Sequence, residues 1–254
     1  MYKYRQTLYQ NYYSNHAGTT DKDKQQAHFN QQKRYFVREF KNHVPANRNL
    51  RVLDIGCGSG SLLAALSELG FSKAYGVDLS EEQVAMAAQF GVKNVVQGDA
   101  KSFLDKQNEG FDLILAVDLI EHLGKDELIE FLKLVQTKLK PGGQVIFRTP
   151  NMDAPLASAF AFADFTHEVF LNKSSANQIM KSVGFNSVQV VEGIMFIENP
   201  IKEFIRKITW SITKLMLKIQ LFASARTWHD VVFSPNMVII GRKSENSLVR
   251  RGVI

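Results

Sequence analysis

Glycine occupies every second position of residues 56–60, shortly after the acidic residue Asp54. Because glycine has no Cβ, the backbone can turn tightly there and a ligand can lie directly against it. The preceding residues, Val52–Ile55, are apolar β-formers and predict a strand. The apolar residues 62–66 predict a helix whose N-terminus faces the same place. A strand, a glycine turn and a helix in this order predict a cofactor-binding unit.

Acidic residues recur at the ends of the strands that follow. Further strands are predicted at residues 74–79, 94–100, 111–117 and 144–147. Asp78 ends the first of these, where a carboxylate suits the two hydroxyls of a ribose, and Asp99 ends the second. An ordinary strand-end or helix-capping aspartate is the alternative for each. The glycines alternate after Asp54 and do not follow GxGxxG spacing, which disfavours a nicotinamide dinucleotide.

These five ordered motifs, from about residue 50 to residue 151, resemble the class I S-adenosylmethionine (SAM)-dependent methyltransferases. Weaker similarity continues to residue 192. Within that family the sequence is most similar to the ubiquinone-pathway O-methyltransferases and the surface-polysaccharide methyltransferases. The resemblance implies SAM as the cofactor and S-adenosylhomocysteine as its product.

The resemblance also assigns cofactor-binding residues along the strand ends. It implies that Asp54 and the glycine turn hold the amino-acid end of SAM and that Asp78 accepts hydrogen bonds from the ribose. Asp99 and the Ala100 amide would contact the adenine, and Val117 with Asp118 would form the floor below the methionine. The complete predicted set is Asp54, Gly56, Gly58, Gly60, Asp78, Leu79, Asp99, Ala100, Val117 and Asp118.

Regular alternation of strands and helices predicts the fold class and the domains. We expect an α/β, Rossmann-like, seven-stranded sheet that is mostly parallel, with helices on both faces and an antiparallel last strand. The methyltransferase domain would span residues 50–243, with a helical insertion at about residues 199–230. Residues 1–49 would form an N-terminal lid or helical segment, which includes an amphipathic helix at residues 25–40. Residues 244–254 would form a mobile tail.

Asp118, Glu121 and His122 follow the fourth predicted strand. If Asp118 opens a helical turn, the three side chains share one face and could hold Mg²⁺ or a similar ion. The pattern is similar to the acid-x-x-Glu-His stretch of ubiquinone-pathway O-methyltransferases and small-RNA 2′-O-methyltransferases, in which these positions bind metal. Asp118 is shorter than the glutamate of those groups. The alternatives are that His122 contacts substrate or removes a proton, or that it is a half-buried structural histidine beside a capping acid.

His167 is the second candidate catalytic residue. It lies in the loop after the fifth strand, and the carboxyl ends of such strands border the substrate crevice. A similar Thr-His pair occurs in relatives from polysaccharide and lipid-modifying pathways, where it faces the acceptor. His167 could therefore handle a proton, act as a fourth ligand if a metal is bound, or be an ordinary loop histidine.

Methyl transfer from a sulfonium requires an aligned acceptor and the exclusion of water. A hydroxyl acceptor must also lose a proton, for which histidine is well suited. The chain lacks the Asn/Asp-Pro-Pro-aromatic motif of amine methylators after strand four, which favours an oxygen acceptor. The leading hypothesis is O-methylation of a small-molecule acceptor or one linked to lipid or glycan. The alternatives are an RNA 2′-O-methyltransferase that uses a divalent metal, and a non-catalytic SAM-binding regulatory or scaffold protein.

The insertion carries apolar residues on one helical stripe and basic residues on much of the rest. Charges interrupt the apolar runs too often for a transmembrane span. A long basic amphipathic helix over residues 199–226 could lie in an anionic membrane interface, or it could pack on its own domain or on a partner subunit. The stripe consists of Ile201, Phe204, Ile205, Ile208, Ile212, Leu215, Met216, Ile219 and Phe222.

Composition agrees with a globular enzyme. The chain has 254 residues, a hydrophobic share of 45% and a formal net charge of +6. The charge permits nucleic-acid binding, but no RNA-binding module accompanies it, so nucleic acid is an unlikely partner. Cys57 is the only cysteine, so no disulfide can form within the chain. The polar, tyrosine-rich N-terminus does not resemble a signal peptide, and we expect an enzyme that is either cytoplasmic or peripheral to the inner face of the membrane.

Overall fold

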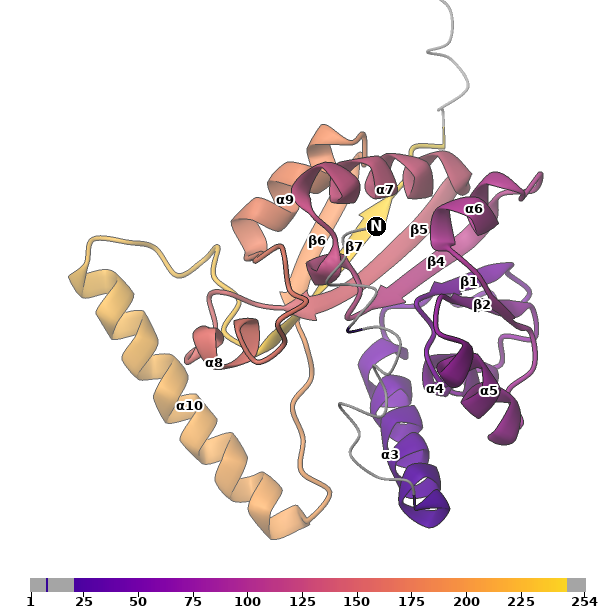
Figure 1. Cartoon of the computed structure of the whole chain (residues 1–254). Helices are drawn as coiled ribbons and strands as arrows, with labels where there is room; N and C mark the ends of the chain where they lie inside the picture. The colour runs from indigo at the N-terminus through magenta and orange to yellow at the C-terminus, as the bar shows by residue number, and fades with distance from the viewer. Residues whose placement is uncertain (1–7, 9–20, 246–254) are drawn as a thin grey trace, which may run out of the picture.

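Seven strands form one mixed sheet in the part of the chain that the computed structural model describes, which is residue 8 and residues 21–245 (Figure 1). The strands are β1 (Val52–Ile55), β2 (Ala74–Asp78), β3 (Val95–Gln97), β4 (Phe111–Val117), β5 (Leu139–Pro150), β6 (Ser187–Glu192) and β7 (Asn236–Arg242). Their order in the sheet is β3-β2-β1-β4-β5-β7-β6, and β7 runs antiparallel to both of its neighbours. The predicted mostly parallel sheet with an antiparallel last strand is confirmed.

Helices cover both faces of this sheet. The helices are α3 (Lys22–Phe40), α4 (Ser61–Glu68), α5 (Glu81–Gln89), α6 (Ala100–Asp105), α7 (Lys125–Lys138), α8 (Ala157–Ala161), α9 (Lys173–Ser182) and α10 (Pro200–Ala223). Alternate residues of β4 enter two different cores: Leu113 and Leu115 pack with α3 and α4, whereas Ile114 and Ala116 pack with α6, α7 and α9. Because both faces are covered, the strands are apolar along most of their length.

The N-terminal helix begins earlier than predicted. Asp21 accepts hydrogen bonds from the amides of Asp23 and Lys24, which places the helix start at Lys22 instead of residue 25. Phe29, Phe36 and Phe40 are buried on its inner side. Residues 1–7 and 9–20 of the predicted lid segment, and most of the predicted tail at residues 244–254, lie outside the described residues.

The fifth strand is longer than the predicted residues 144–147. Residues 140–143 also lie within β5 but bulge out of the ladder between β4 and β5. Phe111 pairs with Leu139, and the next pair joins Leu113 to Gln144. Gly142 adopts a φ of 74°, which the bulge requires. The strand then continues to Pro150 and carries its last residues to the carboxyl edge of the sheet.

The predicted helical insertion is present as α10, which stands beside the sheet and α8 (Figure 1). Asn199 caps its N-terminus by accepting from the amides of Ile201 and Lys202, and Pro200 occupies the first turn. Among the described residues, none of the helices combines the length and the hydropathy needed to cross a bilayer.

Candidate active site

The glycine turn lies between β1 and α4. Gly56, Gly58 and Gly60 have φ values of 71°, 53° and 81°, in the left-handed region that favours glycine. A Cβ on Gly60 would lie 2.8 Å from Cγ1 of Val92, so the backbone passes too close to that side chain for any other residue. The turn therefore places backbone without side chains directly before the N-terminus of α4, where the sequence predicts a ligand-binding turn.

Asp54 is a buried carboxylate with no counter-charge. Its exposure is 1%, and neither carboxylate oxygen has a hydrogen-bond partner among the described residues. Burial, and then the charge of Asp78, raises the pKa of Asp54 well above its ordinary value. An orphaned buried carboxylate is costly for the isolated protein, but it fits a cationic ligand group that enters the turn.

Asp78, by contrast, is fixed by the backbone around it. Its two carboxylate oxygens accept hydrogen bonds from the amides of Gly58, at 2.7 Å, and Ser80, at 2.8 Å. Burial raises the pKa of Asp78, and these two bonds oppose that rise. The side chain of Leu79, which follows it, is 51% exposed at the end of the strand. The Asp78 carboxylate is thus held in one orientation beside the glycine turn, next to the exposed side chain of Leu79.

Asp99 caps a helix. Its Oδ2 accepts a hydrogen bond of 2.8 Å from the amide of Ser102, and Ala100 is the first residue of α6. The capping alternative therefore describes this oxygen. The side chain stays exposed, so capping leaves it accessible at the strand end.

Asp118 does not open a helical turn. It has a φ of 50°, and the helical turn that follows is a 3₁₀ helix at Ile120–His122. The guanidinium of Arg148 donates to both oxygens of Asp118, and Asp118 is not among the ligand atoms that gather around Glu121 and His122. The predicted set of metal ligands, Asp118 with Glu121 and His122, therefore does not assemble. Half-buried Val117 precedes it at the end of β4.

His167, and not the predicted Asp118, lies beside Glu121 and His122. The candidate ligand atoms of these three residues all lie within 4.8 Å of one another, and the rings of the two histidines have centroids 4.8 Å apart. Backbone bonds hold the two loops together, because the Glu121 carbonyl accepts from the amides of Glu168 and Val169. The structure thus brings together the two histidines that the sequence singled out separately.

Hydrogen bonds define which nitrogen of each ring carries the proton. The Thr166 hydroxyl donates to Asp164 at 2.7 Å, so its oxygen accepts from Nδ1 of His122 at 2.8 Å. Nδ1 of His167 lies 2.9 Å from the carbonyl of Ala161, which can only accept. Both rings therefore carry the proton on Nδ1 and the lone pair on Nε2, an assignment that follows from this network.

Burial shifts the pKa values of Glu121 and His122, and with them the protonation of both groups. Burial, followed by the charge of His167, lowers the pKa of His122 to about 4. Burial and then the charge of Asp118 raise the pKa of Glu121 to about 8, and the Thr149 hydroxyl donates to this carboxylate at 3.0 Å. At neutral pH His122 is therefore uncharged and Glu121 is largely protonated.

This cluster fits Mg²⁺ poorly. Magnesium prefers an octahedral shell of oxygen atoms, whereas the cluster offers two imidazole nitrogens and one carboxyl group that prefers to stay protonated. The only other nearby acid that the sequence suggested, Asp118, is bound to Arg148. The arrangement is better suited to accepting a proton than to holding magnesium.

Sequence reasoning missed Arg148 and Tyr35. The Arg148 guanidinium lies over the rings of Tyr35 and Phe36, and the Tyr35 hydroxyl donates to the carbonyl of Ile194. A basic residue at the otherwise apolar end of β5 was the available signal for Arg148. Nothing in the sequence indicated that Tyr35 reaches a segment 159 residues later.

Comparison with known families identifies this arrangement. Residues 27–190 match the family described as methyltransferase domain. The chain belongs to this family. It is a SAM-dependent methyltransferase, and the orphaned carboxylate and glycine turn are consistent with that cofactor.

Individual relatives agree with the family. The chain is 26% identical over 181 residues to a ubiquinone biosynthesis O-methyltransferase of Idiomarina loihiensis, covering 65% of this chain and 72% of that one. It is 37% identical over 105 residues to the Bradyrhizobium diazoefficiens protein of the same name, covering 40% of each. In six further curated relatives of that name, the aligned part spans 37–52% of their length.

Solved structures support the fold. A SAM-dependent methyltransferase from Archaeoglobus fulgidus superposes with a TM-score of 0.62 at 24% identity, covering 83% of this chain and 94% of that one. Phosphoethanolamine N-methyltransferase 2 of Haemonchus contortus, solved with S-adenosylhomocysteine, gives 0.55 at 22% identity, covering 82% of this chain and 52% of that one. At these identities the likeness concerns the fold alone.

Proposed function

We propose that this methyltransferase transfers the methyl group of SAM to a hydroxyl oxygen of a small-molecule acceptor, or of an acceptor linked to lipid or glycan. The observation that carries the proposal is the pair of histidines, His122 and His167, with unprotonated Nε2 atoms at the carboxyl edge of the sheet. The names of the ubiquinone biosynthesis O-methyltransferases support an oxygen acceptor. The absence of the amine-methylator motif after β4 points in the same direction.

The cofactor would bind along the carboxyl ends of β1, β2, β3 and β4. Asp54 would face the ammonium group of the methionine part, because it is a buried carboxylate without a partner. Asp78 would accept from the ribose, and the exposed side chain of Leu79 would lie against the adenine with Asp99 and Ala100. Bound SAM supplies the electrophilic methyl group on its sulfonium.

The histidine pair adjoins this cofactor turn. The Cδ1 atom of Leu119 lies 3.1 Å from the position of a Cβ on Gly56, and His122 follows three residues later. An acceptor hydroxyl in this region would lose its proton to an imidazole Nε2 as its oxygen attacks. Thr166 and the Ala161 carbonyl would hold the two rings in the required tautomer.

Incubation with methyl-labelled SAM and fractionated lysate, followed by identification of the labelled product, tests the proposed function. We expect His167→Gln and His122→Gln to lower kcat at least tenfold while the affinity for S-adenosylhomocysteine stays within about twofold. His229→Gln, which changes an exposed histidine bonded to Thr227, is the control and should retain full activity. Full activity of both site variants would contradict the assignment.

The same assay separates the metal-dependent alternatives. Because the cluster fits Mg²⁺ poorly, we expect the rate not to depend on Mg²⁺, before or after treatment with EDTA. Loss of activity with EDTA and its return with a divalent ion would contradict this expectation. Labelling of RNA by the purified enzyme would favour the RNA 2′-O-methyltransferase, and binding of SAM with no labelled product from any fraction would favour a non-catalytic role.

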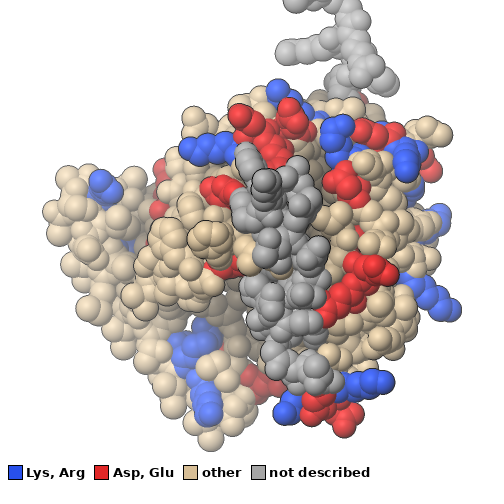
Figure 2. Space-filling model, in the orientation of Figure 1, with Lys and Arg blue, Asp and Glu red and all other residues tan. Residues whose placement is uncertain are grey.

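We further propose that α10 attaches the enzyme peripherally to the inner, cytoplasmic face of a membrane. Within the part of the chain described, α10 contains no buried residue, and the nine side chains of its apolar stripe are 47–73% exposed. The half-buried residues of the helix lie outside the stripe, and they include Trp210, Leu217 and Leu221. The helix thus turns its apolar stripe away from the protein, and Figure 2 has a largely uncharged surface over α8 and α10.

Charge favours an anionic lipid surface over a second copy of this chain. The helix carries five lysine or arginine residues and one glutamate. Two such helices packed together would repel each other, whereas anionic lipid would attract each one. Lys214 pairs with Glu192 at 2.6 Å and would keep the helix attached to the sheet in this orientation.

Co-sedimentation with vesicles tests the membrane contact. We expect binding to vesicles that contain phosphatidylglycerol, weaker binding to pure phosphatidylcholine, and a decrease with salt. Ile208→Asp with Ile219→Asp should weaken binding at least about tenfold, because each side chain loses about 1–2 kcal/mol of apolar transfer. Thr209→Asp with Ser211→Asp adds the same charge beside the stripe and is the matched control. If the protein does not bind vesicles and forms a dimer that only the first variant disrupts, the partner of the stripe is a second copy of the chain and not a membrane.

A further inference from the structure

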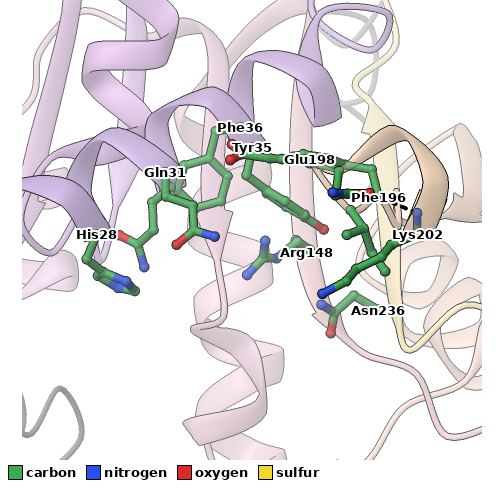
Figure 3. Close-up of a pocket in the computed structure, with 12 residues that line it drawn as sticks. His28, Gln31, Tyr35, Phe36, Arg148, Phe196, Glu198, Lys202 and Asn236 are labelled. Carbon is green, nitrogen blue, oxygen red and sulfur yellow. Dashed lines mark hydrogen bonds between the residues drawn. The ribbon is translucent and has the colours of Figure 1, made fainter.

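A cavity of about 650 Å³ lies between α3, the segment before α10 and the ends of β5 and β7 (Figure 3). Neither the cofactor nor the histidine pair accounts for it. Its walls come from α3 (Gln32, Tyr35 and Phe36), from the segment before α10 (Phe196 and Ile197) and from the start of α10 (Lys202). A cavity of this size can take a small ligand.

Direct contacts keep these walls together. The Tyr35 ring stacks on Phe196 at a centroid distance of 5.8 Å, and Arg34 pairs with Glu198 at 3.0 Å. The buried carboxylate of Glu39 accepts from the Ile194 amide at 3.2 Å. The cavity is therefore a fixed feature of the fold, formed by two segments that lie more than 150 residues apart.

The cavity borders the cofactor turn on two sides. Gln32 accepts a hydrogen bond of 3.1 Å from the hydroxyl of Ser61, the first residue after Gly60. Arg148 lines the cavity and binds Asp118, which directly follows β4. A molecule in the cavity therefore lies beside the place where the methyl group would be presented.

The polar side of the cavity is positively charged. The tips of the Lys202 and Asn236 side chains lie close together there, and Arg148 lines the same cavity (Figure 3). The charges of Arg148 and Glu198 are each matched, by Asp118 and Arg34, whereas Lys202 forms no ion pair with any described residue. The charge of Lys202 is therefore not neutralised by a described residue. The Arg148 guanidinium and the Asn236 amide, which also line the cavity, can donate further hydrogen bonds.

Apolar side chains form the adjoining wall of the cavity, next to the start of α10. The rings of Tyr35, Phe36 and Phe196 and the side chain of Ile197 line it. Lys202 stands between Ile201 and Phe204, the first two members of the exposed stripe, which are 71% and 66% exposed. A ligand with an anionic group in the cavity can therefore continue along an apolar surface.

We infer that this cavity binds the anionic group of an amphiphilic acceptor, a carboxylate or a phosphate, through Lys202 and Arg148. The inference rests on the proposed function, because it names the class of acceptor that the methyltransferase takes. The apolar part of the acceptor lies against the aromatic wall and the start of the α10 stripe. An acceptor that resides in a membrane reaches the methyl group from this end of α10.

Calorimetry with octyl phosphate, octanoate and uncharged octyl glucoside, each below its micelle concentration, tests the inference. The full chain is first saturated with S-adenosylhomocysteine. We expect at least one anionic probe to bind more tightly than octyl glucoside, and the tighter of the two identifies phosphate or carboxylate as the group. Lys202→Met should weaken that probe three- to tenfold. Lys218→Met, which removes a lysine of the same helix outside the cavity, should leave it unchanged.

Three results would overturn the inference. Equal binding of anionic and uncharged probes would remove the charge recognition, and equal effects of the two lysine variants would make the attraction non-specific. Displacement of the probe by S-adenosylhomocysteine would assign the cavity to the cofactor. A failure of S-adenosylhomocysteine itself to bind would instead refute the proposed function, and the probe titrations without it report on the cavity independently.

Discussion

Replacement of Asp54 by asparagine gives the sharpest test of the cofactor site, because its effects on stability and on binding have opposite signs. In the protein without cofactor, the carboxylate of Asp54 is buried and unpartnered. Its pKa in the folded state is raised, so the unfolded chain ionises at a lower pH than the folded one. Below the ordinary aspartate pKa, Asp54 is protonated in both states and the folded protein keeps its full stability. As the pH rises from there toward the folded pKa, the free energy of unfolding decreases.

The size of both effects follows from burial. An unsatisfied buried polar group costs about 1–3 kcal/mol and a charged one more, so Asp54→Asn should stabilise the cofactor-free protein by about 1–3 kcal/mol at neutral pH. For a chain of this length each kcal/mol corresponds to about 2–4 °C in Tm. Loss of one partner of a buried ion pair costs about 3–5 kcal/mol, which predicts about 10²- to 10⁴-fold weaker binding of SAM.

Thermal unfolding between pH 4 and pH 8 and calorimetry with S-adenosylhomocysteine measure the two effects. The difference in Tm between wild type and Asp54→Asn should be small at pH 4 and grow as the pH rises. Asp105→Asn changes an exposed aspartate that pairs with Lys101, and neither quantity should move by more than the error of measurement. Unchanged affinity in Asp54→Asn, or a less stable protein at pH 7, would refute the reasoning.

Two further predictions concern the glycine turn and the buried glutamate. Gly60→Ala should lower stability by at least about 1–2 kcal/mol, because residue 60 has a φ of 81° and Val92 leaves no room for a Cβ, and circular dichroism on heating would detect the loss. A Tm equal to wild type would mean that the turn can rearrange. The folded pKa of Glu121 is raised to about 8, so wild type should lose stability between about pH 4.5 and pH 8, and Glu121→Gln should reduce that loss in denaturant titrations at several pH values. An identical pH slope in both proteins would show that Glu121 ionises normally.

The sequence by itself determined the cofactor half of this protein. The pattern of apolar strands, each followed by a turn residue or an acid, fixed the order of the elements, because parallel strands buried on both faces must be apolar and their carboxyl ends must meet at one edge. Gly56, Gly58 and Gly60 are local requirements, since each has a positive φ. The amphipathic helix α10 was equally readable from its 3.6-residue period.

Only the tertiary structure decided how the second half of the site is assembled. Asp118 pairs with Arg148 of β5, 30 residues later, and the structure gathers His167 instead of Asp118 beside Glu121 and His122. His122 and His167 lie 45 positions apart in the sequence, and only the packing of their loops brings the rings together. The outward direction of the α10 stripe is also a property of packing, because periodicity defines a face of a helix but not what that face meets.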